Sequence, residues 1–339
     1  VLLAPVVPFA LLARRDGLPL VVPLLAIVAH AALPGGWYGG GYTELVEWGL
    51  VTNVGAAVAL LFAFAWSLSW VEDGNLAALA GAGLAGGLSL VTNPRSFLAF
   101  GASGLGILIA SRLGANDRAA PSWRVIIARL VAAGALMGLL AAPELMSLAR
   151  FSRLYTFVQY SGYAGPADFA RAAADSLTWP VVLLGLGGGV IAVATPRWPA
   201  GRAAFATGLV YAAGTLLFTE SSPVRGLVPQ LEATRLMPFQ RLLTVYLAAV
   251  AVWAICSFAT RRIGAGRGSA EGVVAVVAAL LLVWQVRPGW NVVPDPADPA
   301  IPARGLYPVE HSAQPQQASL EAAVGAADAA APPGTAILV

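Results

Sequence analysis

The segment LVPQLEATRLMPFQR, residues 227–241, places Glu232, Arg235 and Arg241 directly before an apolar stretch. An arginine fork can bind a phosphate through two charge-assisted hydrogen bonds, so Arg235 and Arg241 could hold a phosphate while Glu232 orients one of them. Alternatively, Glu232 and Arg235 are i,i+3 neighbours on a short helix and form a structural ion pair. Other ionisable residues have a similar placement beside apolar stretches: Glu44, Glu47, Arg95, Glu144, Arg150, Arg153, Glu220 and Arg225.

The composition requires a membrane environment for the elements that position these residues. Hydrophobic residues make up 58% of the chain, charged residues only 11%, and the mean hydropathy is +0.75. Such a chain has too few polar residues to cover a water-soluble globule of 339 residues. The net charge of +3 is small, and the basic residues form no stripe along the sequence. No nucleic-acid partner is therefore expected.

The apolar stretches predict an all-α polytopic transmembrane bundle with about ten spans, each a stretch of roughly 16 to 25 residues. They lie near residues 2–13, 18–33, 50–70, 76–92, 96–111, 125–146, 178–195, 203–219, 238–260 and 271–286.

The loops between these stretches differ in charge. One alternate set, which begins with Arg14 and Arg15, carries more arginines than carboxylates, and the other set carries the reverse. The positive-inside rule therefore places the first set in the cytoplasm, and the longer loops and the C-terminal tail outside a plasma membrane. In the outer loop at 147–176, apolar residues from Leu148 to Val158 recur at helical spacing and predict a helix that lies in the interface.

Three regions follow from this pattern. Residues 1–286 form the transmembrane domain, and the proline-rich residues 287–317 form an extracytoplasmic linker. Residues 318–339 are expected to be a helix, a turn and a strand, the start of an extracytoplasmic α/β domain that is cut short; the N-terminal end also looks cut.

Signatures of soluble enzymes are missing from the sequence. No glycine loop is followed by a lysine as in a phosphate-binding loop, and the glycines of GAGLAGG and GLGGGVIA are expected to be helix-packing surfaces. His30 and His311 have no partner at zinc-ligand spacing, and Cys256 is the only cysteine. No cofactor is certain. A divalent metal stays open, because Glu44 and Glu47 could share an oxygen-ligand site.

Three segments carry a resemblance to a known family: GGGYTELVEWGLVTNVGAAVALLFAFAW, LVTNPRSFLAF, and LEATRLMPFQRLL with its Glu-x-x-Arg. In order and spacing the chain resembles the polytopic membrane proteins called 6-pyruvoyl-tetrahydropterin-synthase-related, which are similar to the C-type (GT-C) glycosyltransferase superfold. Asn93 stands where these relatives often have histidine, so no role of that histidine carries over. The first outer loop, in which the superfold usually keeps its acidic catalytic residue, is expected to be missing.

The resemblance implies transfer of a sugar from a polyprenyl-phosphate-linked donor to a glycan or glycolipid acceptor at the outer leaflet. A carboxylate must take the proton of the acceptor hydroxyl, and cations must stabilise the departing lipid phosphate. We expect Glu44 or Glu47 to be the catalytic base. The residues expected to bind the lipid phosphate are Arg95, Arg150, Arg153, Arg235 and Arg241, with Glu232 orienting an arginine.

Two other classes of function stay open. A lipid or glycolipid transporter, or a flippase, would need polar residues midway through its spans and interrupted helices near the midplane. A membrane scaffold for cell-envelope assembly would need binding surfaces but no cluster of carboxylates and arginines around a cavity.

Overall fold

The computed structural model describes residues 3–33, 40, 51–113, 121–151, 162–224, 233–264 and 266–289. Within these ranges the chain forms helices and no strand. The helices are α1 (Val6–Arg15), α2 (Val21–Ala32), α3 (Val51–Asp73), α4 (Leu76–Thr92), α5 (Ser96–Leu113), α6 (Trp123–Phe151), α7 (Pro166–Leu177), α8 (Trp179–Ala194), α9 (Pro199–Leu217), the short 3₁₀ helix η4 (Ala233–Leu236), α10 (Met237–Arg262) and α11 (Arg267–Gly289).

The all-helical prediction is confirmed, and each apolar stretch coincides with a helix, but the prediction of about ten spans is wrong. Among the described residues, four helices, α3, α5, α6 and α10, are long and apolar enough to cross a membrane. The number rises to five if the bent pair of α7 and α8 counts as one span. A span needs about 20 residues at 1.5 Å each. By contrast, α1 has 10 residues, α2 has 12 and α4 has 17.

The described helices belong to one compact unit, residues 1–288. The linker predicted at 287–317 lies outside the described residues except for its first three positions, which belong to α11. The α/β domain predicted at 318–339 is not part of the described fold, which contains helices and no strand. That segment lies outside the described residues.

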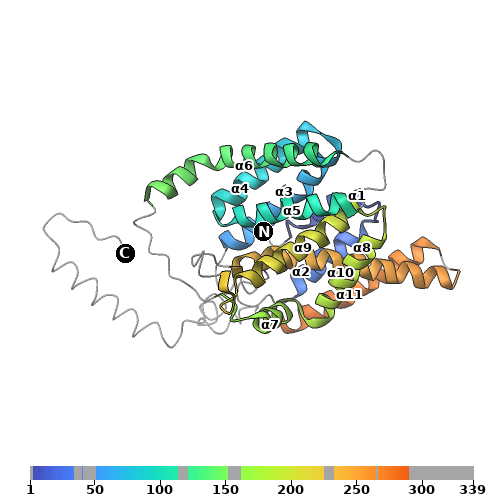
Figure 1. Ribbon diagram of the computed structural model, residues 1–339. Helices are drawn as coiled ribbons and strands as arrows, with labels where there is room; N and C mark the ends of the chain where they lie inside the picture. The colour runs from blue at the N-terminus through green and yellow to red at the C-terminus, as the bar shows by residue number, and fades with distance from the viewer. Residues whose placement is uncertain are drawn as a thin grey trace, which may run out of the picture. The chain divides into compact units, whose positions relative to one another are not determined.

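Helices α3 and α4 pack antiparallel, as do α5 and α9, whereas α8 runs parallel to α10 and α4 runs parallel to α6 (Figure 1). The most extensive pairs are α3 with α4, α8 with α10, α5 with α9, and α4 with α6. Helix α10 also contacts α2, α3 and α9, and 16 of its residues are buried, so it lies at the centre of the unit. Its Tyr246 stacks on Phe9 of α1 with ring centroids 5.9 Å apart.

Glycines lie at close contacts between these helices, among them Gly188 of the GLGGGVIA segment, which was predicted from the sequence to be a packing surface. A Cβ added to Gly188 of α8 would overlap the carbonyl oxygen of Leu247 in α10, and one added to Gly106 of α5 would overlap Thr207 of α9. Such helices approach closely because no side chain separates their backbones.

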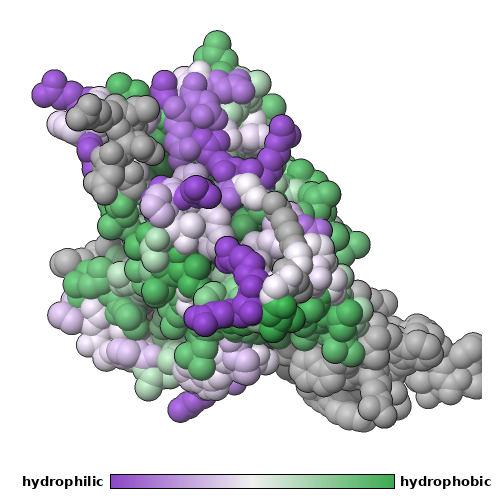
Figure 2. Space-filling model, turned by 90° about the vertical axis from the view of Figure 1, so that its right-hand side faces the viewer, coloured by the Kyte–Doolittle hydropathy of each residue, from purple (hydrophilic) through white to green (hydrophobic). Residues whose placement is uncertain are grey.

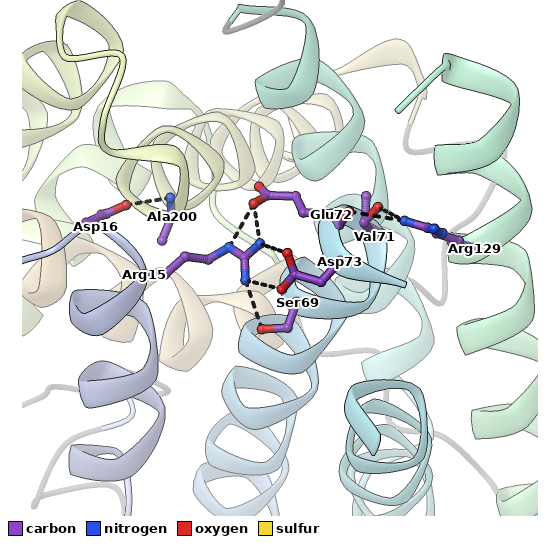
Figure 3. A network of polar contacts seen from close by, with 8 residues as sticks. All are labelled: Arg15, Asp16, Ser69, Val71, Glu72, Asp73, Arg129 and Ala200. Atoms are coloured by element: carbon purple, nitrogen blue, oxygen red, sulfur yellow. Dashed lines mark hydrogen bonds and ion pairs between the residues drawn. The ribbon is translucent and has the colours of Figure 1, made fainter. Parts of the chain in front are cut away.

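At one end of the unit, Arg15 bonds across to the end of α3 (Figure 3). Its guanidinium forms ion pairs with Glu72 and Asp73 and donates to Ser69 Oγ at 3.1 Å. Arg129 of α6 donates to the carbonyl oxygen of Val71 at 2.7 Å. We call this end, where α1, α3, α8 and α10 finish, the Arg15 end. Hydrophilic side chains gather over it, with hydrophobic surface around them (Figure 2).

These contacts bring together loops that the charge pattern had assigned to one side of the membrane. The loop at 72–75 contains no arginine of its own, yet its two carboxylates pair with Arg15 of the first loop. Asp16 of that first loop contacts the start of α9. The structure therefore shows that these loops lie at the same end of the unit. That this end faces the cytoplasm remains a prediction.

Candidate functional site

Arg241, predicted to bind a phosphate, is fully buried near the start of α10, with 0% of its surface exposed. Its Nε donates to His30 Nδ1 at 3.3 Å. One terminal nitrogen, Nη1, donates to the carbonyl oxygen of Ser176 at 2.5 Å and to its Oγ at 3.1 Å. The other, Nη2, donates to the carbonyl oxygens of His30 at 2.9 Å and Leu33 at 2.6 Å. These bonds match the five N–H groups of a guanidinium.

The carbonyl groups that Arg241 binds lie at the C-terminal ends of two helices. His30 and Leu33 lie at the end of α2, and Ser176 lies in the last turn of α7. The last four carbonyls of a helix have no partner within it and carry the negative end of its dipole. Arg241 therefore satisfies the ends of two helices at once, and a phosphate could reach it only by displacing these bonds. We call this end of the unit the Arg241 end.

His30 is held in one tautomer by this contact. Because its Nδ1 accepts from Arg241, its Nε2 carries the proton of the neutral ring. His30 is also fully buried, and its Nε2 has no hydrogen-bond partner in the described part of the chain.

The other predicted site residues are distributed as follows. Glu44, Glu47, Arg153 and Glu232 lie outside the described residues, as does the side chain of Arg235, whose backbone belongs to η4. Arg150 is exposed near the end of α6, and Arg95 is partly exposed between α4 and α5. Their role as phosphate ligands thus stays a prediction.

Arg95 borders a small notch at the Arg241 end, in which Asn53 and Asn93 lie beside apolar residues. Its backbone N–H donates to Asn93 Oδ1 at 3.1 Å, and Asn93 Nδ2 donates to Asn53 Oδ1 at 3.0 Å. Leu236, the residue after Arg235, also lines the notch. The notch has a volume of about 20 Å³, which is enough for one water molecule and too small for a sugar. Asn93 therefore shapes the turn into α5 and ties it to α3.

A sharp bend separates α7 from α8. The two helices meet at an angle of 100° around Thr178, whose φ of 65° is rare for a residue other than glycine. Helix α7 is amphipathic, since Arg171 and Asp175 are exposed and Leu177 is buried. If α8 crosses the membrane, α7 lies near the membrane plane, as expected of an interfacial helix. The amphipathic helix of this loop is α7 at 166–177, whereas residues 148–151, the start of the predicted interfacial helix, continue α6.

A lateral pocket of about 250 Å³ lies beneath α7 and between α8, α9 and α10. Its walls are almost entirely apolar, and α7 contributes Phe169, Ala173 and Leu177. The polar residues of the wall, Gln240 and Thr244, are bonded within the protein: Gln240 Nε2 donates to Thr215 Oγ1 at 3.3 Å, and Thr244 Oγ1 donates to the carbonyl oxygen of Gln240 at 2.8 Å. Such a pocket suits a hydrocarbon chain and offers little to a polar ligand.

Adjacent residues in α7 and in α10 connect the lateral pocket with the Arg241 contacts. Ser176 accepts from Arg241, and the next residue, Leu177, lines the pocket. On α10, Gln240 lines the pocket while the adjacent Arg241 points to α2 and α7. Arg241 thus holds the C-terminal end of α7 over the pocket.

Asp16 at the Arg15 end was not among the predicted site residues. Its Oδ1 accepts from the backbone N–H of Ala200 at 2.8 Å, and its Oδ2 accepts from Gly201 at 2.9 Å and from the Tyr246 hydroxyl at 3.2 Å. Asp16 therefore caps the first turn of α9 from another part of the chain. Burial raises the pKa of its carboxyl to about 7, although these three hydrogen bonds act to lower it.

The described residues contain no group of three His, Cys, Asp or Glu side chains that could hold a metal ion. The metal option at Glu44 and Glu47 lies outside them. Comparisons with family models, with curated proteins and with solved structures gave no match to this chain.

Proposed function

We propose that this chain is a membrane-embedded glycosyltransferase whose donor is a sugar linked to a polyprenyl phosphate. The hydrocarbon chain of the donor occupies the lateral pocket, and its phosphate lies toward the polar residues of the Arg241 end. The observation that supports this proposal most is the apolar pocket of about 250 Å³ beneath an amphipathic helix. An amphipathic lid over an apolar pocket suits a ligand with a hydrocarbon tail and a polar head.

In this proposal the arginines divide into two roles. Arg95, Arg150, Arg153 and Arg235 are candidates to bind the lipid phosphate, because a guanidinium matches a phosphate in shape and charge. Arg241 is a positioning residue, since its N–H groups bind the protein and hold α7 over the pocket.

The proposed reaction needs a base and an anion stabiliser. Glu44 or Glu47 takes the proton of the acceptor hydroxyl, whose oxygen then forms a bond to the anomeric carbon of the donor sugar. The bond from that carbon to the phosphate oxygen breaks, and the polyprenyl phosphate leaves with the electron pair. Arginine side chains stabilise the negative charge on the leaving phosphate.

A matched pair of substitutions in α9 tests this function. Gly208 lines the pocket, and a Cβ added there meets nothing within 4 Å, so Gly208→Leu fills pocket space without a backbone clash. Gly214 on the same helix has equal room but does not line the pocket, so Gly214→Leu is the control.

We expect transfer from a radiolabelled polyprenyl-phosphate sugar to fall about tenfold in Gly208→Leu, because losing two methylene contacts costs about 1.6 kcal/mol. Gly214→Leu should transfer sugar like the wild type. Equal activity in both variants would contradict the placement of the donor chain in this pocket, and no transfer by the wild type with any donor would contradict the function.

The 100° bend at Thr178 favours a second candidate, a lipid transporter, because transporters often bind substrate at interrupted helices. The two candidates differ in one measurement. Proteoliposomes without any acceptor should move the labelled lipid between leaflets if the protein is a transporter, and should leave it in place if the protein is a transferase.

A further inference from the structure

A second cavity, of about 1060 Å³, lies at the Arg15 end. It is bordered by the turn after α1, the end of α8, the last turns of α10 and the start of α11. The lateral pocket lies among α7, α8, α9 and α10 and shares no lining residue with this cavity. We call it the Arg15-end cavity.

Two arginines from different segments of the chain line the Arg15-end cavity. Arg197 follows α8, and Arg261 lies in the last turn of α10, where its Nε donates to the carbonyl oxygen of Ser257 at 2.9 Å. Both side chains are exposed, and among the described residues no carboxylate lies within ion-pair distance of either one. Two such cations can meet one anion through charge-assisted hydrogen bonds.

The carboxylate in the cavity wall belongs to Asp16, and its oxygens are already occupied. They accept from Ala200, Gly201 and Tyr246. By contrast, Ser257 in the same wall has a buried Oγ without a hydrogen-bond partner in the described part of the chain. A buried polar group of this kind is usually satisfied by water or by a ligand.

The rest of the wall is apolar and aromatic. Trp198 and Trp253 line it together with Ile191, Ile255 and Phe258. Tryptophan is enriched at the membrane–water interface, and basic pockets between transmembrane helices bind anionic lipid headgroups. A small soluble anion such as inorganic phosphate would use the arginines and leave this apolar surface uncovered.

We infer that the Arg15-end cavity binds an anionic phospholipid, with the phosphate between Arg197 and Arg261 and an acyl chain along the apolar wall. This site is separate from the proposed donor site, so its test does not depend on transferase activity. Its ligand would hold the α10–α11 turn against the ends of α1 and α8.

Lipid retention by the full chain tests the inference. The protein is reconstituted in nanodiscs that contain equal amounts of phosphatidylglycerol and phosphatidylcholine, extracted in mild detergent, and analysed by native mass spectrometry. We expect the wild type to retain phosphatidylglycerol, and Arg197→Gln and Arg261→Gln each to lower this retention about tenfold, the lower end of the contribution of a charged hydrogen bond.

Two further variants separate charge from shape. Arg112 lies near the end of α5 at the same end of the unit but does not line the cavity, so Arg112→Gln should retain lipid like the wild type. Ala254 lines the apolar wall, so Ala254→Trp should lower retention while both arginines stay in place.

Three outcomes would overturn the inference. One is equal retention in the wild type and both arginine variants, and another is an equal loss in Arg112→Gln. The third is full displacement of phosphatidylglycerol by millimolar inorganic pyrophosphate without any effect of Ala254→Trp, which would assign the cavity to a soluble phosphate compound.

Discussion

Replacing Arg241 by methionine tests the role of the buried guanidinium. The substitution keeps an unbranched side chain and removes every N–H group of the guanidinium. The carbonyl oxygens of Ser176, His30 and Leu33 therefore lose their donors. A buried acceptor left unsatisfied costs about 1 to 3 kcal/mol. Three such acceptors give a loss of at least about 3 kcal/mol in the free energy of unfolding, to which the hydrogen bonds of His30 Nδ1 and Ser176 Oγ add.

The assay is thermal unfolding of the purified protein in detergent. A loss of about 3 kcal/mol should lower the apparent Tm by at least about 5 °C in a protein of this size. Arg241→Lys should fall between the wild type and Arg241→Met, because an ammonium keeps the charge and three donors but not the planar fork.

A surface arginine of the same helix provides the control. Arg262 is exposed, and its guanidinium lies over the Phe258 ring. Arg262→Met should therefore change the free energy of unfolding by less than about 0.5 kcal/mol. An unchanged Tm in Arg241→Met, together with a complete loss of sugar transfer, would refute the positioning role and restore Arg241 as a phosphate ligand.

Two further predictions concern the Arg15 end and the glycine contacts. The pKa of Asp16 rises from 3.8 to about 7 on folding, so the folded state binds the proton more tightly. Stability should then decline as pH rises from about 4 to about 7, by at most about 4 kcal/mol, and Asp16→Asn should remove this decline in unfolding scans across that range. In α8, Gly188→Ala should lower the Tm because its Cβ overlaps the Leu247 carbonyl oxygen, whereas Gly187→Ala has open space and should not. A free energy of unfolding of the wild type that does not change with pH, or equal Tm values for the two alanine variants, would contradict these contacts.

The positions of the helices follow from the sequence because each apolar stretch is bounded by charged or proline-containing loops. The stretch predicted at 76–92 has the same bounds as α4, and the one at 238–260 lies within α10. The number of spans does not follow, because an apolar stretch also forms a short helix that is buried among its neighbours. Helix α2 is such a case: it has 12 residues, and seven of them are buried.

The candidate site is less accessible to sequence reasoning. Arg241 was recognised as a residue at the start of an apolar helix, but its partners at His30 and Ser176 are 211 and 65 residues away along the chain. No local pattern reveals that the ends of α2 and α7 meet at this side chain. The signal for α7 was present in Gly165 and Pro166, a common helix start, followed by an amphipathic stretch.

The lateral pocket is central to the proposed function, and photocrosslinking tests it most directly. The full chain in nanodiscs is incubated with a polyprenyl-phosphate sugar that carries a diazirine near the phosphate end of its hydrocarbon chain, then irradiated and digested. We predict that the labelled peptides come from α7, α8 and α10 and that the labelled residues include Phe169, Leu186 and Leu243. Unlabelled polyprenyl phosphate should reduce this labelling. Labelling confined to the exposed faces of α4 and α6, or labelling that polyprenyl phosphate does not reduce, would contradict the account.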